Sequence, residues 1–262
     1  MKYNRLIALI LITGMLFMFP SFSFSQERPA GKGVSPVLPP PSEDQKEKPS
    51  SQDIESQHKK LTKPVSMPIY VPPRRGAPVG RVGGGTRGIQ YELVTLFVLV
   101  PDHAGLTVQE QPTLYWYLSK PVHHPVEVTI IEDQAIYPLL ETGIPLPTQP
   151  GIHPIDLKDY TVSLSLDKQY RWYVAIIPDP DRRSRDIIAG GMIERIEPSE
   201  NIRTKLAQAD KETIPYIYAE AGIWYDALAA ISDLIDATPD DAGLRKERSA
   251  LLEQVGLSEI AD

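Results

Sequence analysis

Two stretches near the middle of the chain have the hydrophobic patterns of β-strands. Residues 89–101 (IQYELVTLFVLVP) form a nearly continuous apolar run, which is typical of a strand covered on both faces. Residues 112–121 (PTLYWYLSKP) alternate instead, because apolar and more polar side chains follow each other along the chain. One face carries Leu114, Trp116 and Leu118, and the other carries Thr113, Tyr115 and Tyr117. The alternation predicts that the first set faces a core and the second faces outward.

Five further segments have the length and composition of strands. They are rich in β-branched and aromatic residues, and turns that contain Pro, Gly, Asp or Lys separate them. They cover residues 125–133, 135–141, 151–157, 170–178 and 187–196, and the first two are expected to form a hairpin. About seven strands in roughly 110 residues, with no long helical period between them, predict an immunoglobulin-like antiparallel β-sandwich.

One local feature favours the same fold. Tyr170 opens the strand that contains Trp172. In immunoglobulin-like sandwiches a tyrosine at this place, the tyrosine corner, bonds back to the backbone a few residues upstream. Trp172 would then meet Trp116 from the opposite sheet, and the two indoles would form the largest part of the core.

The C-terminal part of the chain has helical periodicity. Residues 216–237 (YIYAEAGIWYDALAAISDLIDA) place apolar side chains at helical spacing. The tetrapeptide Thr238-Pro239-Asp240-Asp241 is a good start for a second helix over 239–254. The fold class is therefore mainly β with α: a β-sandwich domain at 81–198, followed by an α-helical hairpin at 199–262 that packs on it.

The segment before residue 81 has a different composition. A positively charged start, an apolar run over 6–19 and small residues at Ser23 and Ser25 predict a signal peptide at 1–25. An uncleaved signal anchor is the alternative. Residues 26–80 are rich in proline and poor in large apolar side chains, so we expect a disordered Pro-rich tether. The protein is therefore expected to be exported, to the periplasm or the extracellular space.

Composition excludes several classes of function. The chain has 262 residues, no cysteine and a formal net charge of -7. The lack of cysteine excludes disulfides, thiolate metal sites and cysteine nucleophiles. The acidic balance argues against nucleic acid as a partner, because nucleic-acid-binding proteins need a basic patch for the phosphates. Membrane contact is expected only through an uncleaved signal segment, if at all.

Gly83, Gly85 and Gly88 spell the G-x-G-x-x-G pattern of dinucleotide-binding loops. Such a loop follows a strand and opens a helix, whose N-terminus holds the pyrophosphate. Here a Pro-rich stretch precedes the glycines and a strand follows them, so we expect no nucleotide and no other cofactor. The glycines are interpreted as a close approach of the chain to the sandwich edge, with Arg87 pairing an acidic neighbour.

Asp179, Asp181, Ser184 and Asp186 place oxygen atoms at spacings that can bind calcium. Three arginines lie among them and would compete for the carboxylates. The stretch also lacks the glycine and the final glutamate of an EF-hand. A self-paired Asp/Arg turn between two strands is the favoured interpretation, and no metal is expected.

Other catalytic or metal-binding chemistry is sparse. His123-His124 is interpreted as a solvated turn rather than as a metal site. Glu132-Asp133 and Glu194 could in principle pair as the carboxylates of a glycosidase. There is no G-x-S-x-G elbow for a serine nucleophile. We therefore expect a protein that is not an enzyme. A deep pocket that holds two or more of these carboxylates would overturn this expectation: Asp133, Asp179, Asp186 and Glu194.

A set of aromatic residues is the main candidate for binding. Tyr115, Tyr117 and Tyr173 are expected on the outward faces of their strands, and Trp224 and Tyr225 lie in the predicted helix. If exposed, these side chains form a flat interaction face for sugars or a protein partner. The favoured interpretation, however, is that the helical hairpin packs on this face and buries both sets.

Several motifs occur in an order that resembles one known family. They are GGGTRG (83–88), a loose GLT..EQPTLYWYL (105–118), YRWYVAIIPDPDRRSRD (170–186), MIERIEP (192–198) and AEAGIWYDALAAI (219–231). Over roughly residues 72–262 the chain is similar to the domain-of-unknown-function family numbered 928, frequent in cyanobacteria. The resemblance implies an exported bacterial protein with no assigned activity. It also implies that Gln90 lies near Pro178, because many members carry a cysteine at each of these two places.

Together these observations predict an exported bacterial envelope protein that acts as a non-catalytic protein-interaction module. Its partner is expected to be another envelope protein. A carbohydrate-binding envelope protein that uses an exposed aromatic face is the alternative. The exposure of the tyrosines discriminates between the two, because a sugar platform must be open to solvent.

Overall fold

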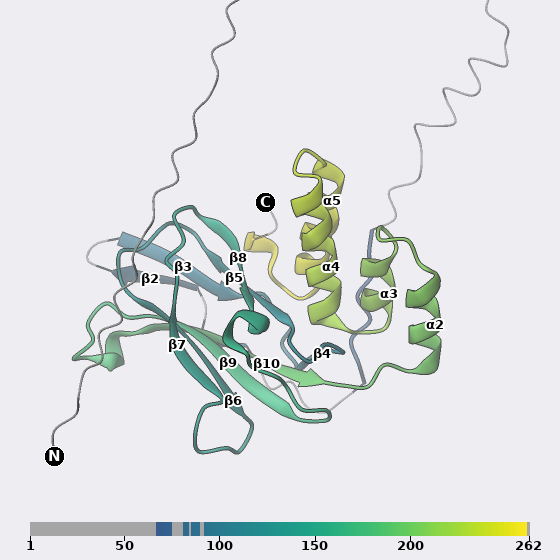
Figure 1. Ribbon diagram of the computed structural model, residues 1–262. Helices are drawn as coiled ribbons and strands as arrows, with labels where there is room; N and C mark the ends of the chain where they lie inside the picture. Colours follow the sequence, from purple (N-terminus) through teal and green to yellow (C-terminus); the bar gives the residue numbers. More distant parts are fainter. Residues whose placement is uncertain (1–66, 75–80, 84, 90–91, 261–262) are drawn as a thin grey trace, which may run out of the picture. The chain divides into compact units, whose positions relative to one another are not determined.

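The computed structural model describes residues 67–74, 81–83, 85–89 and 92–260. The predicted signal peptide, most of the predicted tether and Gln90 lie outside these residues. Within them, the strands form two sheets, and the helices follow in the C-terminal part of the chain (Figure 1). The predicted class, mainly β with α, is confirmed.

The first sheet has six strands in the order β1-β10-β9-β6-β7, with β4 paired to β10 off this path. All its neighbours are antiparallel except β4 and β10, which are parallel. Its strands are β1 (Val82–Gly83), β4 (Gly105–Thr107), β6 (Val126–Glu132), β7 (Leu140–Ile144), β9 (Gln169–Ile176) and β10 (Ile187–Arg195).

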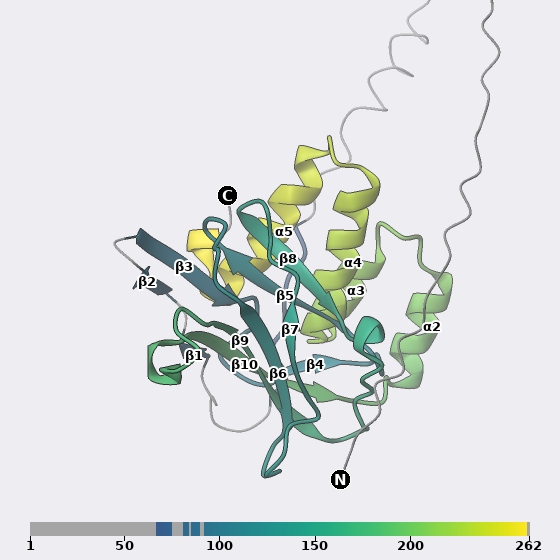
Figure 2. The ribbon, with the colours of Figure 1, turned by 60° about the vertical axis from the view of Figure 1, so that its left-hand side comes forward.

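The second sheet has four strands in the order β2-β3-β5-β8, and all its neighbours are antiparallel. Its strands are β2 (Gly85–Ile89), β3 (Glu92–Val98), β5 (Thr113–Leu118) and β8 (Gly151–Asp156). The two sheets can be followed separately in Figure 2.

The core contains the side chains that the alternation on β5 selects. Leu114, Trp116 and Leu118 are almost completely buried. Trp172 on β9 is buried in the same cluster, which has members from both sheets. Both predicted tryptophans are in the core, and together with Trp224 they are its largest fully buried side chains within the described residues.

The hairpin after β6 differs from the prediction. Its second strand is β7 rather than residues 135–141, and Ile130 pairs with Leu140. The intervening loop holds Gln134 at a positive φ of 68° and Pro138, which has no N–H to donate to a ladder. The very short β4 was not predicted, because its three residues depend on pairing with the distant β10.

The helical part consists of four α-helices within the described residues: α2 (Glu200–Gln208), α3 (Ile214–Glu220), α4 (Trp224–Ala237) and α5 (Ala242–Gln254). The single helix predicted over 216–237 is broken at Gly222, which has a φ of +74°. The next helix begins later than predicted, because Asp241 caps it by accepting from the N–H of Gly243. No helix in the described ranges has the length and apolar character needed to cross a bilayer.

Helix α4 begins inside the core. The Trp224 indole N–H donates to the carbonyl of Leu99 at 2.8 Å, directly after β3. The Trp172 indole donates to the Tyr225 hydroxyl at 2.8 Å, and that hydroxyl donates to the carbonyl of Met192 on β10. The first turn of α4 is thereby bonded to strands of both sheets, and the sheets and α4 share one core.

Residues 67–74, the N-terminal strap, pack against the helices. The N–H of Val71 donates to the carbonyl of Ala219, and the N–H of Tyr70 donates to the Gln254 side chain. Tyr70 is buried, with its ring edge-on to Trp224. For these residues the expectation of a disordered tether is wrong, because Tyr70 supplies apolar area and its partners on the helices are distant in sequence.

Candidate functional site

The glycine-rich segment forms strands and not a phosphate-binding loop. Gly83 ends β1 and pairs with Ala189, whereas Gly85 begins β2, which also contains Gly88. The chain therefore passes from the edge of one sheet to the edge of the other. β2 is followed by β3 and not by a helix, as predicted. The side chain of Arg87 lies outside the described part, so its pairing stays a prediction.

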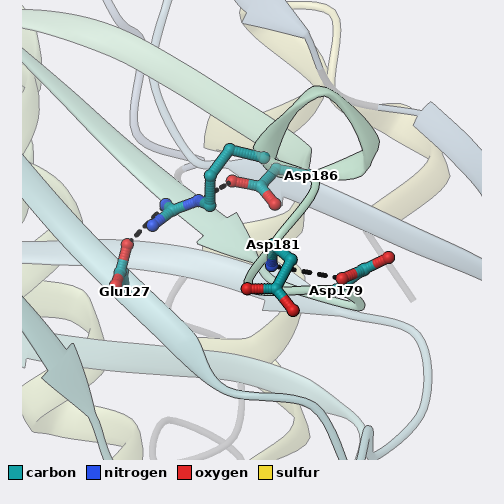
Figure 3. Close-up of polar contacts among 5 residues, drawn as sticks. Glu127, Asp179, Asp181 and Asp186 are labelled. Carbon is teal, nitrogen blue, oxygen red and sulfur yellow. Dashed lines mark hydrogen bonds and ion pairs between the residues drawn. The ribbon is translucent and has the colours of Figure 1, made fainter.

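The acidic turn before β10 is paired with its own arginines (Figure 3). The Arg183 guanidinium contacts Asp186 at 2.7 Å and Glu127 at 2.6 Å. Asp179 accepts from the N–H of Asp181 at 3.1 Å, and Arg182 and Arg185 each approach its other oxygen to 3.8 Å. These contacts are the ones expected of a self-paired Asp/Arg turn. Among the described residues, no three His, Asp or Glu side chains gather in a metal-binding group.

The five aromatic residues do not form one exposed face. Trp224 and Tyr225 are buried in the core, and Tyr115 is only 7% exposed. Burial, followed by the nearby Asp233 on α4, raises the pKa of the Tyr115 hydroxyl to about 12. The exposed face is therefore wrong, and the favoured interpretation, burial by the helices, holds for Tyr115, Trp224 and Tyr225, because α4 enters the core and covers Tyr115. The carbohydrate-binding alternative loses the platform on which it rested.

The two remaining tyrosines of that set are half-buried and lie on different sheets. Tyr117 is on β5, whereas Tyr173 is on β9. The Tyr173 ring covers Gly190 on β10, where an added Cβ would lie only 2.3 Å from the ring. The two rings therefore lie on different sheets, and the Tyr173 ring packs against Gly190.

Tyr170 occupies the place expected of a tyrosine corner. It is buried, and its hydroxyl accepts a hydrogen bond from the N–H of Ser165 at 3.0 Å. The predicted bond back to the upstream backbone is therefore present.

The other candidate carboxylates are paired separately. Glu132 forms an ion pair with Lys168, and Asp133 forms one with Arg171. Glu194 accepts from the Gln169 side chain at 2.9 Å. Asp186 lines a cleft on the outer side of β9 and β10, but Asp133, Asp179 and Glu194 do not line it. His123 and His124 lie in the loop before β6.

A different cleft contains the most unusual polar group of the described residues. It has a volume of about 430 Å³ and lies between the β4–β5 loop, α3 and one side of α4. We call it the Asp226 cleft. The residues that form its walls and rim include Gln109, Pro112, Lys158, Lys211, Ile214, Tyr218, Asp226, Ala229, Ala230, Asp233 and Leu234.

The spacing of residues along α4 explains why a cleft forms there. Asp226, Ala230 and Asp233 follow each other at intervals of three or four residues and share one side of the helix. Leu228 and Ile231 point to the opposite side and are buried in the core. Alanine at 230 leaves a hollow where a larger side chain would fill the space.

Asp226 lies at the buried end of this stripe and is only 4% exposed. Its Oδ2 accepts from the N–H of Val108 at 3.2 Å, whereas Oδ1 has no hydrogen-bond partner of good geometry. Burial raises the pKa of the Asp226 carboxyl to about 6, against hydrogen bonds from the Thr107 and Gln109 side chains, which favour the charged form. The first turn of α4 also favours a carboxylate, but no cation contributes.

The rim of the cleft carries further charges. Lys158 comes from the 3₁₀ turn after β8, and Lys211 comes from the segment between α2 and α3. Burial raises the pKa of Asp233, as does Asp236, while Lys158 opposes this effect. Burial also raises the pKa of the Tyr218 hydroxyl. The cleft therefore combines one buried carboxylate with an apolar wall and a mixed-charge rim.

Our sequence reasoning missed Asp226. The residue is part of the motif AEAGIWYDALAAI, which looks like a packing helix. The available clue was a single acidic residue directly after two large aromatic residues, on the side of the helix expected to be buried. A carboxylate in such a place needs a cation or hydrogen-bond donors, and the sequence near it contains no cation.

Comparison with curated proteins gives no match to the chain. Over residues 82–262 the sequence matches the family described as Domain of Unknown Function (DUF928). This match spans both sheets, all four helices and the Asp226 cleft, and it covers well over half of the chain. The chain therefore belongs to the DUF928 family, as the order of its motifs predicted.

Proposed function

We propose that this protein is an exported bacterial envelope protein that acts as a non-catalytic protein-interaction module, and that the Asp226 cleft holds a segment of its partner. The observation that carries the proposal is a hollow of about 430 Å³ lined by the buried carboxylate of Asp226, which has no cation beside it. A volume of this size falls within the range of roughly 300–1,000 Å³ found for ligand sites.

We interpret the two sheets as an immunoglobulin-like sandwich with a C-terminal helical hairpin formed by α4 and α5. The strand orders, the parallel pairing of β4 with β10 and the Tyr170–Ser165 bond support this interpretation. A rigid sandwich would present the cleft as a preformed site, which reduces the entropy that is lost on binding.

Export is proposed from the N-terminal sequence. The pattern of residues 1–25 has a charged start, an apolar run and a small-residue cleavage site. N-terminal sequencing of the protein recovered from the periplasm or medium is expected to begin at Gln26. A chain that keeps Met1 and fractionates with membranes would support the signal-anchor alternative instead.

The interaction is tested by site-specific photo-crosslinking in cells. A photo-reactive amino acid replaces Lys211, an exposed residue at the rim of the cleft. The matched control carries it at Tyr137, which is 83% exposed in the β6–β7 loop, away from the cleft. We expect one envelope protein to be captured from position 211 and not from position 137.

A cleft-filling substitution shows whether capture depends on the cleft. Ala230→Trp, in the protein with the crosslinker at position 211, should abolish capture because the indole occupies the hollow. Ala207→Trp on α2 is the control, since that exposed alanine does not line the cleft. Equal capture by both variants would refute the proposed site. Removal of all helices is no substitute for this test, because Trp224 and Tyr225 are part of the core.

A further inference from the structure

We infer that the Asp226 cleft recognises a basic side chain of the partner, with the ammonium or guanidinium group next to the Asp226 carboxylate and the aliphatic stem along the wall of the cleft. This inference rests on the proposed function and names the chemistry of the ligand.

Asp226 has no counter-charge from its own helix. Asp226 is almost completely buried, and its Oδ2 accepts from the N–H of Val108. The side chains of Thr107 and Gln109 also favour its charged form by hydrogen bonding, but its buried Oδ1 has no partner of good geometry, and no cation lies beside the carboxylate. A buried carboxylate without a cation is costly, and a charge-assisted hydrogen bond relieves that cost. Helix α4 has three aspartates and no lysine or arginine, so it supplies no cation itself.

The wall of the cleft has polar and apolar parts. Gln109, Gln111 and Thr113 form polar parts of the wall, and its apolar parts include Ala230, Ile214, Leu234 and Pro112. The apolar side chains offer no hydrogen bonds and suit methylene groups. Lysine and arginine suit such a cleft, because each has an apolar stem that ends in a charged group. A carboxylate ligand would bring a second negative charge to Asp226.

Other charged groups also face the cleft. They are Lys158 and Lys211 at the rim and Asp233 on α4, with the Tyr218 hydroxyl on α3. The two lysines repel a segment that carries many positive charges and attract acidic neighbours. The cleft is therefore suited to one basic side chain that reaches Asp226, in a segment that is otherwise neutral or acidic.

The test uses four short capped peptides as probes and the mature protein, residues 26–262. The peptides are Gly-Lys-Gly, Gly-Arg-Gly, Gly-Nε-acetyl-lysine-Gly and Gly-Glu-Gly, and binding is followed by backbone amide NMR shifts. Acetylation removes the positive charge of lysine and keeps most of its stem. We expect the Lys and Arg peptides to shift the amides of Gln109, Ala229 and Ala230, with affinity about tenfold or more above the acetylated peptide.

Two matched variants locate the effect. Asp226→Asn keeps an oxygen for the Val108 N–H and removes the charge, so it should reduce the preference for Lys over acetyl-lysine to near one. Asp233→Asn removes the carboxylate at the rim of the same cleft and should keep most of that preference. Far-UV circular dichroism and the thermal midpoint show whether each variant is folded.

A pH titration of the wild-type protein provides a second measurement that needs no variant. Burial raises the pKa of Asp226 to about 6, so protonation below that pH removes the charge and binding of the Lys peptide should weaken. Among the groups that face the cleft, Asp233 is the other carboxyl, and the titration is repeated in Asp233→Asn to separate the two. A Lys affinity that stays constant from neutral pH to pH 4 would overturn the inference.

Other outcomes also decide the matter. Equal affinity for the Lys and acetyl-lysine peptides, tighter binding of the Glu peptide through Lys158 and Lys211, or no shifts at the cleft would each refute the basic-ligand inference. Capture from position 211 could still succeed in those cases, and the proposed function would stand. Conversely, selective Lys binding without capture of any partner would refute the proposed function alone.

Discussion

Asp186 and Asp226 are two buried aspartates with different surroundings. The Asp186 side chain is 3% exposed, and Asp226 is 4% exposed as a residue. Each has an Oδ1 without a hydrogen-bond partner, and each lines a cleft. However, the other oxygen of Asp186 contacts the Arg183 guanidinium, whereas Asp226 has no cation and is held by hydrogen bonds from Thr107, Val108 and Gln109.

The difference arises from local sequence. The turn before β10 contains three arginines within four residues of Asp186, so the acidic cluster neutralises itself. Helix α4 contains no basic residue, so Asp226 depends on groups from other parts of the chain or from a partner. A cluster of acidic residues can thus be neutralised by arginines in the same turn, whereas a single acidic residue in an apolar helix needs a partner from elsewhere.

The largest effect is expected from a core substitution in the helix that carries Asp226. Trp224→Ala should destabilise the protein by roughly 3–5 kcal/mol, the usual range for a buried large aromatic residue. The helix that carries Asp226 would lose its hydrogen bond to Leu99 and its packing in the core. Urea unfolding followed by circular dichroism measures the loss. Tyr137→Ala, at an exposed loop position, is the control, and a similar loss there would contradict the assignment.

The next effect is the pH dependence of stability that the Asp226 carboxyl causes. The pKa of Asp226 is raised from 3.8 to about 6 in the folded protein, so the folded state holds its proton over a range in which the unfolded state has lost it. Stability must therefore fall as pH rises through this window, by roughly 3 kcal/mol. Asp226→Asn should lack this decrease, so that its stability relative to wild type increases between pH 4 and pH 7.

Urea unfolding at several pH values checks this prediction. Asp233→Asn, which changes an exposed carboxyl on the same helix, is the control. Parallel pH profiles for the wild type and Asp226→Asn would show that the buried carboxyl does not destabilise the folded state.

A smaller effect concerns the attachment of α4. Tyr225→Phe removes the hydroxyl that accepts from Trp172 and donates to Met192, and leaves a buried indole N–H unpaired. We expect a loss of about 1–3 kcal/mol, typical of an unsatisfied buried donor. Equilibrium unfolding is the measurement, and Tyr117→Phe on the half-buried face of β5 is the control. An unchanged stability would mean that water replaces the hydroxyl.

The smallest effect is expected in the turn that contains Asp186. Arg183→Gln removes the cation between Asp186 and Glu127. Because the arginine is half-exposed, its pairs are screened by solvent, and we expect only a small decrease in the thermal midpoint that shrinks with added salt. A decrease as large as that of Trp224→Ala would show that the turn supports the core.

Parts of the fold were predictable because they depend on local pattern. The alternation over 112–121 identified which side chains of β5 face the core, and Tyr170 bonds upstream as its position indicated. Other parts depend on distant partners. Gly222 lies within a continuous helical pattern, and an added Cβ there would lie 2.6 Å from the carbonyl oxygen of Val71. The break at Gly222 therefore reflects the strap, which no local rule includes.

The same limit applies to the candidate site. The aromatic residues were identified as a set, but their exposure depends on how α4 enters the core through Trp224 and Tyr225. Asp226 accepts from the N–H of Val108, which is 118 positions away in the sequence. A hydrophobic pattern places a residue on one face of a helix, but it does not show which loop covers that face.

The N-terminal strap also determines where mechanical load enters the molecule. Its bonds join Pro68 and Tyr70 to Gln254 on α5, and Val71 to Ala219 on α3. A force that pulls on the chain before Met67 reaches these two helices before it reaches β1. The Asp226 cleft is formed in part by α3, so tension in the N-terminal segment would act on the walls of this cleft.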